Sequence, residues 1–390
     1  MKKIGILTYF TDIPYFNDIN PGTNLQAYSV FIALKNQYPE ATVELIRYHS
    51  WWAIWRIYLS GMTLNSLKQD IVQFWKYYKF SKGFKLSSKS LVTSNPSNAY
   101  RFFNSLNYDA IYVGSDTVLE LFRSKPSEIA PYWLDKSVKA KKIMLAASAR
   151  DTSLNQLSNA QKKKIQTSID SFLMLGIRDV ATFQLINNFV GKNDSRLRII
   201  HDPTLNYDID YSCAQKYARK KGFFKERKPI ICFHLLKENT FAQELAKKLK
   251  EKGFLIASLR PAKYADIVFK DLSPVEFAGI FRYFYLTLTH RFHDSVFCIK
   301  NKTPFLVFPP SSDHINESGS SKHSYLLDAF DIRKECFIEN IDCESVESLY
   351  ERILSTPAKF KNKLYSIEKC LLQYKQDFLG YIKESQQLVN

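Results

Sequence analysis

The sequence predicts an α/β protein with two domains, each built on a parallel sheet. Apolar segments of strand length alternate with segments of helical length along most of the chain, and this alternation is typical of strand–helix–strand units. It is interrupted at residues 206–228, a polar stretch rich in Tyr and Lys, and then restarts. A chain of 390 residues is also too long for one core of ordinary size. We therefore expect a first domain over residues 1–208 and a second over residues 209–390.

The first domain is expected to begin with a strand at 4–10, a helix at 21–35 and a second strand at 43–46. Its later strands all end in turns of small or polar residues. These strands are expected at 108–113, 142–148, 172–177 and 197–200, with a helix at 155–168. Because the carboxyl ends of parallel strands lie at one edge of a sheet, the turns should meet where ligands bind. The turns are Gly114–Asp116, Ala146–Ser148, Arg178–Asp179 and His201–Thr204.

Residues 51–107 break this rhythm and are expected to form a helical insertion. Its aromatic residues fall at roughly helical spacing, with basic residues between them, and include Trp51, Trp52, Trp55, Phe74, Trp75 and Tyr78. One interpretation is a pair of interfacial helices that touch a membrane or a lipid-linked acceptor. The other is a helical insertion whose aromatic side chains pack on the first domain. We favour packing, because it is the commoner role of such side chains.

In the second domain, strands are expected at 229–235, 254–259, 284–288 and 304–308. Helices are expected at 241–251, from Ser273, after Asp294, at 346–355 and at 361–379. The helix at Ser273 has a capping serine, a proline at its first position and Glu276 to complete a capping box. A segment rich in Ser and Gly at 311–321 is a candidate mobile lid.

The turn Thr289–Asp294 follows the strand at 284–288 and is the densest group of reactive side chains. Histidine exchanges protons near neutral pH, and arginine binds anions with a planar fork of donors. The helix that follows would add its positive N-terminal end. Asp294 is expected to cap that helix rather than to orient His293, and His290 is given no role. The spacing of His290 and His293 also occurs in metal sites, but no further ligand cluster supports one, and we expect no metal.

Composition and charge restrict the partners. The net charge is +17, yet no nucleic-acid-binding motif or Arg-rich arm is present, so we expect anionic small substrates or lipid-linked ones and no nucleic acid. The six cysteines have no C-x-x-C spacing, which favours free thiols in a reducing compartment. The apolar run near the N-terminus is too short for a signal sequence. A cytoplasmic protein is expected, with contact at the inner face of the membrane left open.

Several segments, taken in order, resemble the polysaccharide pyruvyl transferase family. Residues 20–28 read NPGTNLQAY and resemble its N-Y-G-x-x-L-Q-A-Y opening. Residues 108–116 read YDAIYVGSD and resemble its Y-D-x-x-x-x-G-S-D segment. The later matches follow in the family's order, at Ala146–Ser148, Arg178–Asp179, Asp202–Thr204 and Arg291–His293.

The resemblance implies two Rossmann-like domains in a glycosyltransferase-B-like arrangement, with a cleft between them. It also implies transfer of a pyruvyl (enolpyruvyl) group from phosphoenolpyruvate to hydroxyls of a saccharide or lipid-linked saccharide. The product would be a pyruvate ketal in a cell-surface polysaccharide, and no cofactor would be needed. Arg291 and His293 would be catalytic, and Arg178 would contact the donor from the opposite domain. The other predicted substrate-binding residues are Asn20, Gly22, Gln26, Ser115, Asp116 and Phe292, which lie in these motifs, and Lys322, which lies at the candidate lid.

Three positions depart from the family pattern. Pro21 replaces its tyrosine, and Thr117 and Leu119 replace its glutamine and tryptophan. These changes leave the acceptor open, together with two alternatives for the whole chain: a glycosyltransferase that uses a nucleotide sugar, or a non-catalytic glycan-binding member. Ser115 and Asp116 would bind acceptor hydroxyls or cap a helix, and the local sequence does not decide between these roles.

Overall fold

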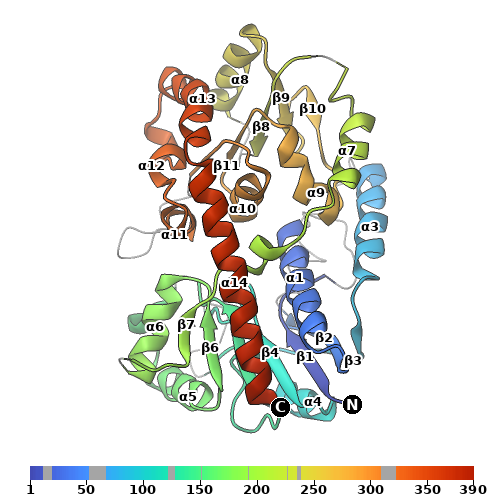
Figure 1. Ribbon diagram of the computed structural model, residues 1–390, viewed down its shortest axis with the longest axis vertical. Coiled ribbons are helices and arrows are strands. Elements are labelled where there is room, and N and C mark those ends of the chain that lie inside the picture. Colours follow the sequence, from blue (N-terminus) through green and yellow to red (C-terminus); the bar gives the residue numbers. More distant parts are fainter. Residues whose placement is uncertain are drawn as a thin grey trace. The chain divides into compact units, whose positions relative to one another are not determined.

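The computed structural model divides into two compact units, one formed by residues 1–207 with 374–390 and the other by residues 208–373. Each unit contains one sheet in which every strand pairs in parallel (Figure 1). The structure describes residues 1–11, 20–51, 67–121, 128–150, 152–191, 193–225, 227–234, 239–308 and 322–390. The candidate lid at 311–321 therefore lies outside the described residues, as do Trp52 and Trp55.

The first unit has a seven-stranded sheet in the order β3-β2-β1-β4-β5-β6-β7 (Figure 1). Helices cover both faces, and the strand residues alternate accordingly. Ile4 and Ile6 pack with α1 and α14, whereas Leu7 packs in the core that includes α4, α5 and α6. The strands are β1 (Lys3–Leu7), β2 (Thr42–His49), β3 (Leu86–Val92), β4 (Ala110–Val113), β5 (Lys141–Ala147), β6 (Met174–Ile177) and β7 (Leu197–Ile199). The helices are α1 (Pro21–Gln37), α3 (Leu67–Ser81), α4 (Pro96–Ser105), α5 (Asn159–Ile169), α6 (Val180–Val190) and the C-terminal part of α14 (Leu364–Val389).

The expected helical insertion at 51–107 is only partly helical. It contains α3 and α4, but between them β3 joins the sheet as an edge strand beside β2. The sequence LSSKSLV lacks an apolar run because an edge strand is paired on one side only. One face of α3 packs on the unit as expected: Tyr77 is buried, and Phe80 contacts the rings of Tyr28 and Phe84.

The C-terminal helix differs from the expected domain assignment. Residues 374–390 of α14 pack on the first unit rather than on the second. Tyr381 donates a hydrogen bond to the carbonyl of Met144 at 2.8 Å, directly over Gly176. A Cβ at Gly176 would lie 2.8 Å from the Tyr381 ring, so only glycine admits this close approach.

His201 contacts this same helical segment and should make stability depend on pH. Its ring lies 3.7 Å from that of Tyr374, and burial lowers the pKa of His201 from 6.5 to about 4, against the opposing charges of Asp377 and Asp202. The unfolded chain therefore takes up a proton at a higher pH than the folded one. The stability associated with neutral His201 is complete above pH 6.5 and is lost as the pH falls to about 4.

We expect His201→Phe, which keeps a ring against Tyr374, to flatten this dependence. The free energy removed by acidification should fall by up to about 3 kcal/mol relative to wild type. Unfolding measured by denaturant at several pH values between 7 and 4 checks this. An unchanged pH dependence in the variant would contradict the assignment.

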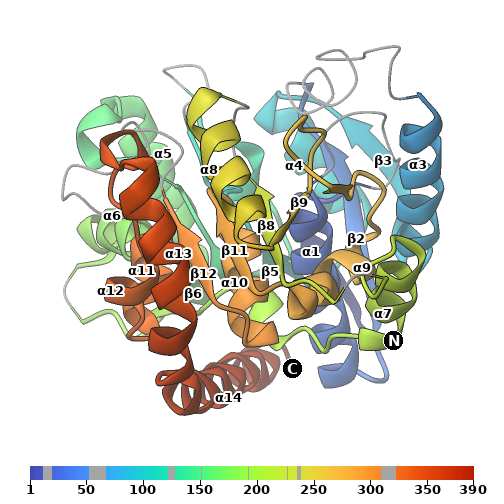
Figure 2. The same ribbon diagram turned by 90° about the horizontal axis from the view of Figure 1, so that it is seen from above.

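The second unit has a five-stranded sheet in the order β10-β9-β8-β11-β12, and Figure 2 labels β8, β9, β11 and β12. One face packs on α8 and α13 through side chains such as Leu245, Leu249 and Ile353. The strands are β8 (Ile230–His234), β9 (Leu255–Ser258), β10 (Ile267–Val268), β11 (Leu286–Thr289) and β12 (Phe305–Val307). The helices are α7 (Tyr211–Lys220), α8 (Thr240–Glu251), α9 (Pro274–Ile280), α10 (Phe292–Asn301), α11 (Lys322–Ala329), α12 (Arg333–Cys336), α13 (Val346–Lys361) and the start of α14.

Candidate functional site

In each sheet, the chain first adds strands on one side of its first strand and then crosses over to add the later strands on the other side. The predicted site residues gather where this reversal of strand order occurs. In the first unit the reversal lies between β1 and β4, and in the second between β8 and β11. Connections leave such neighbouring strands in opposite directions, which opens a crevice at their carboxyl ends where ligands bind in open α/β sheets.

In the first unit, the turn after β4 has an unusual backbone. Gly114 has φ +113°, and a Cβ there would lie 2.4 Å from the carbonyl oxygen of Leu145, so glycine is required. A cis peptide bond joins Gly114 to Ser115, and Asp116 has φ +77°. Thr8, directly after β1, donates a hydrogen bond to the carbonyl of Ser115 at 2.8 Å. Left-handed backbone at a non-glycine residue is costly and concentrates at functional sites.

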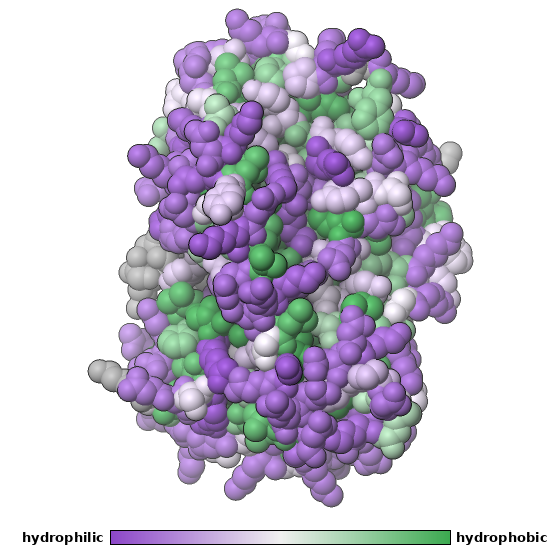
Figure 3. All heavy atoms as spheres, viewed as in Figure 1, coloured by the Kyte–Doolittle hydropathy of each residue, from purple (hydrophilic) through white to green (hydrophobic). Residues whose placement is uncertain are grey.

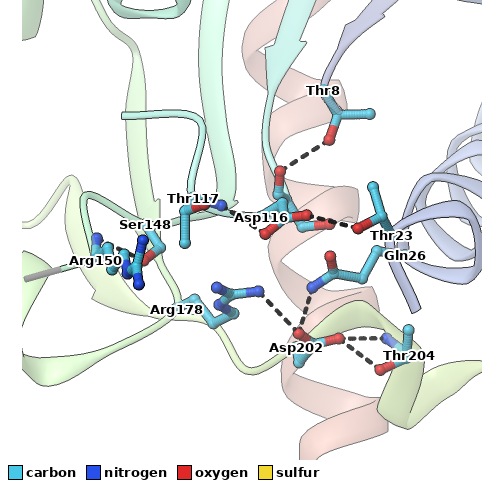
Figure 4. A network of polar contacts seen from close by, with 11 residues as sticks. Thr8, Thr23, Gln26, Asp116, Thr117, Ser148, Arg150, Arg178, Asp202 and Thr204 are labelled. Carbon is cyan, nitrogen blue, oxygen red and sulfur yellow. Dashed lines mark hydrogen bonds and ion pairs between the residues drawn. The ribbon is translucent and has the colours of Figure 1, made fainter. Parts of the chain in front are cut away.

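The Asp116 carboxylate is held by a side chain of α1 and by the backbone of its own turn (Figure 4). One carboxylate oxygen accepts a hydrogen bond from the hydroxyl of Thr23 in α1 at 3.1 Å, and the other accepts from the backbone N–H of Thr117 at 2.8 Å. Turns and bends, not a helix, follow over the described residues 117–121. The helix-capping role considered for Ser115 and Asp116 is therefore wrong. The carboxylate instead joins α1 to the end of β4.

Asp202 connects two of the predicted residues (Figure 4). Its Oδ2 atom accepts a hydrogen bond from the Gln26 amide at 2.5 Å and pairs with the Arg178 guanidinium at 3.1 Å. Its Oδ1 atom accepts from the backbone N–H and the hydroxyl of Thr204. All these groups are largely buried, so Arg178 has a structural ion pair that the sequence did not predict.

Two further predicted residues lie at the start of α1. Asn20 is its N-cap residue and accepts a hydrogen bond from the N–H of Gly22 at 3.1 Å, while Gly22 itself is buried. These contacts shape the beginning of the helix that carries Thr23 and Gln26. Asn20 and Gly22 thus support the cluster, and the structure gives each a local role.

Arg150 is a residue near this cluster that the sequence reasoning did not single out. It lies just beyond β5 with φ +57°, and its N–H donates to the hydroxyl of Ser148 at 3.0 Å. Its guanidinium pairs with the buried carboxylate of Glu120 at 3.0 Å. Its position directly after the small-residue turn Ala147–Ser148, at the end of a strand, could have indicated Arg150 from the sequence.

In the second unit, a chain of hydrogen bonds holds the turn after β11. The backbone N–H of Arg291 donates to the hydroxyl oxygen of Thr289 at 3.0 Å. The Thr289 hydroxyl donates to Oδ2 of Asp294 at 2.7 Å, and the same oxygen pairs with Nδ1 of His234 at 2.6 Å. Thr289 and Asp294 are fully buried. The backbone of Arg291 is therefore fixed relative to both β8 and β11.

This arrangement corrects the expectation for Asp294. Arg291 is the N-cap residue of α10, and Asp294 turns inward to His234 and Thr289 instead of capping the helix or orienting His293. His234, the last residue of β8, was missed because its partner is 60 residues away in the chain. Its register opposite Thr289 brings the two strand ends together.

The protonation states follow from these contacts. Burial would raise the pKa of Asp294, but the charge and hydrogen bond of His234, the Thr289 hydroxyl and the charge of Arg291 outweigh it and lower that pKa. His290 donates from Nδ1 to the carbonyl of His234 at 2.8 Å, because a carbonyl can only accept. Burial, with the charges of His234 and Arg291, lowers the pKa of His290 to about 3, so this ring is neutral at neutral pH.

Three side chains lie near the ring of Phe292 in the first turn of α10. The ring of Phe292 lies 5.5 Å from His293 and 6.1 Å from His323, and the ammonium of Lys322 lies 5.6 Å from the Phe292 ring centre. The predicted residues Phe292, His293 and Lys322 are therefore neighbours, and Arg291 directly precedes Phe292 in the chain. The Lys322 ammonium near the first turn of α10, with Arg291 at the N-cap position of that helix, favours an anionic ligand.

Neither a metal-binding cluster nor a membrane-spanning helix occurs among the residues that the structure describes. Among them, no group of three or more His, Cys, Asp or Glu side chains is arranged to hold a metal ion. No helix within them combines the length and apolar character needed to span a bilayer.

Comparisons with known sequences add two findings. A family model described as polysaccharide pyruvyl transferase matches residues 20–312, which include every predicted site residue except Lys322. No curated protein matches the sequence.

Among solved structures, UDP-GlcNAc 2-epimerase from Neisseria meningitidis bound to UDP-GlcNAc has a TM-score of 0.57 and 9% identity, covering 99% of this chain and 100% of that one. The corresponding epimerase from Methanocaldococcus jannaschii has a TM-score of 0.52 and 11% identity, covering 91% of each chain. At such identities the likeness concerns the fold, which is the expected one of two parallel-sheet α/β domains. That Arg178 and Arg291, from different units, contact one donor stays a prediction.

Proposed function

The chain belongs to the polysaccharide pyruvyl transferase family, and on that premise we propose that it transfers a pyruvyl group from phosphoenolpyruvate to saccharide hydroxyls. The product is a cyclic pyruvate ketal on a cell-surface polysaccharide or its lipid-linked precursor. The acceptor is a pair of hydroxyls on one sugar, and no cofactor takes part.

The turn of the second unit is the proposed donor site. One observation carries this assignment: Arg291 and His293 lie together at the N-terminus of α10, beside the point where strand order reverses. Phosphoenolpyruvate bears a carboxylate and a phosphate, and both suit a guanidinium fork and a positive helix end. The hydrogen bonds through Thr289 and Asp294 fix the backbone from which Arg291 projects. Such preorganisation lowers the cost of binding.

His293 is the proposed acid and base. A proton is added to the methylene carbon of phosphoenolpyruvate, and a sugar hydroxyl oxygen bonds to the neighbouring carbon and loses its proton. The bond from that carbon to the phosphate oxygen then breaks, and the second hydroxyl oxygen takes its place and also loses its proton. Of the two protons lost by the hydroxyls, one balances the new methyl group and one leaves with phosphate. Histidine exchanges protons at neutral pH and suits these steps.

The cluster of the first unit is the proposed site for the saccharide hydroxyls. Asp116 and Thr23 offer a carboxylate and a hydroxyl at the carboxyl edge of the sheet, while the buried Gln26 amide donates to Asp202 (Figure 4). Such groups form the hydrogen bonds that sugars require. The left-handed backbone at Asp116 supports a functional reason for this geometry.

Turnover tests the proposal. The full chain is incubated with phosphoenolpyruvate and a panel of oligosaccharides and lipid-linked saccharides, and released phosphate and product mass are measured. Phosphate should appear only with an accepted saccharide, whose mass rises by one pyruvic acid less one water. His293→Gln should reduce the rate by about 10²–10⁴-fold, the usual contribution of acid–base catalysis.

Arg282→Ala is the matched control, because Arg282 lies in the same unit and stacks on Tyr211. It should leave the rate unchanged. Transfer at the wild-type rate by His293→Gln would contradict the role of His293. Transfer of a sugar from a nucleotide sugar, without use of phosphoenolpyruvate, would contradict the proposed reaction.

A further inference from the structure

The outward face of α3 combines exposed apolar and basic side chains. Ile71 is 45% exposed, Val72 is 39% exposed and Trp75 is 54% exposed, although α3 is held on the first unit by Tyr77 and Phe80 on its other side. Hydrophilic residues dominate the face of the molecule seen in Figure 3. Large apolar side chains gathered on one helix face therefore need a reason.

The apolar residues form one stripe. Ile71, Trp75 and Tyr78 are spaced by four and three residues, which places them along a single line of an α-helix. The Trp75 ring contacts the rings of Phe74 and Tyr78, each at 5.7 Å. Tryptophan and tyrosine are the side chains most enriched where a membrane meets water.

Basic residues continue the same stripe. Lys79 and Lys82 are exposed, and the Lys82 ammonium lies 4.6 Å from the Tyr78 ring centre. Residues 71–85 contain four lysines, at 76, 79, 82 and 85, and no acidic residue. The whole chain carries a net charge of +17. This stripe therefore presents aromatic and cationic groups together, although Asp70 precedes it in α3 and Lys85 pairs with Glu44 at 3.9 Å.

We propose that the outward face of α3 docks on an anionic lipid bilayer. Trp75, Ile71 and Val72 enter the boundary between headgroups and acyl chains, while Lys79 and Lys82 contact anionic headgroups. Positive charge on the helix complements the negative surface of a bilayer that contains anionic lipid. A second copy of this positively charged face lacks that complementarity. The docking does not depend on the proposed transfer reaction.

Vesicle co-sedimentation of the full chain tests this proposal. Vesicles of phosphatidylcholine alone are compared with vesicles of equal parts phosphatidylcholine and phosphatidylglycerol, at low and high salt. Wild type should bind only the anionic vesicles, and salt should weaken binding. Lys79→Ala with Lys82→Ala should lower the partition coefficient by about 25-fold, since each lysine near an anionic surface is worth about fivefold.

Trp75→Ser should also reduce binding, whereas Phe224→Ser should not, although Phe224 is 53% exposed. Circular dichroism establishes that each variant is folded, and the lysine variants test the proposal even if Trp75→Ser is unstable. Wild type that fails to bind anionic vesicles, or lysine variants that bind as well as wild type, would overturn it. A dimer of wild type that Trp75→Ser dissociates, with vesicle binding unaffected, would assign the face to a second copy instead.

Discussion

Replacing Asp294 by alanine is expected to destabilise the second unit by about 2–6 kcal/mol, because the change leaves two buried hydrogen-bonding groups, those of His234 and Thr289, without their partner. The Asp294 carboxylate is fully buried and accepts hydrogen bonds from His234 and Thr289. Its pKa is lowered in the folded chain, so the carboxylate is charged at neutral pH, and its stabilisation is lost only as the pH falls through that lowered pKa. Denaturant unfolding of the full chain at neutral pH measures the loss.

Asp210→Ala provides the matched control in the same unit. Asp210 is the N-cap residue of α7 and accepts a hydrogen bond from the N–H of Ser212, so its loss should cost about 1 kcal/mol. Asp294→Asn keeps the shape of the side chain but removes its charge. This variant therefore separates the contribution of the charge to stability from that of packing. An effect of Asp294→Ala no larger than that of Asp210→Ala would show that the buried chain of hydrogen bonds does not hold the turn.

Arg178→Leu is expected to destabilise the first unit by about 3–5 kcal/mol as well. The change removes the counter-charge of Asp202, whose side chain is 2% exposed, and leaves that carboxylate buried. Asp202 also binds Gln26 and Thr204, so its charge cannot turn toward water without breaking those contacts. Free energies of unfolding for the single variants check the size of the effect.

A double-mutant cycle separates this ion pair from general damage to the site. Arg178→Leu combined with Asp202→Asn should recover part of the lost stability, because the uncompensated charge is gone. Additive losses in the double variant would mean that the 3.1 Å contact between Arg178 and Asp202 contributes no coupling energy. Arg178 would then be retained for another reason, such as the donor contact that the family resemblance implies.

Most strands of both sheets were readable from the sequence because they are buried on both faces. β4 and β11 are short, fully buried segments followed at once by polar turns. β3 was not readable, since its sequence LSSKSLV is polar and it gains strand geometry only by pairing with β2. The packing of the end of α14 on the first unit could not be predicted from the sequence either, because it depends on the contact of Tyr381 with distant Gly176.

The candidate sites were likewise only partly predictable from the sequence. Placement of Arg291 and His293 at a strand end followed from local pattern, because any strand–turn–helix sequence places its turn at that edge. The partners that fix these turns did not follow, since they come from elsewhere in the chain. Asp202 lies 176 residues from Gln26, and Asp294 lies 60 residues from His234. Aspartate is a residue type that commonly caps helices. Only the contact with His234, at the end of the neighbouring strand, turns the Asp294 carboxylate into the protein interior.

The central claim is that the turn at Arg291 binds phosphoenolpyruvate, and calorimetric titration of the full chain tests it most directly. Phosphoenolpyruvate should bind wild type and Arg282→Ala with equal affinity. Arg291→Ala should weaken binding by about 10–100-fold, as expected for loss of hydrogen bonds between charged groups. Equal binding of phosphoenolpyruvate by Arg291→Ala and wild type would contradict the claim, and so would a wild-type chain that binds UDP-GlcNAc but not phosphoenolpyruvate.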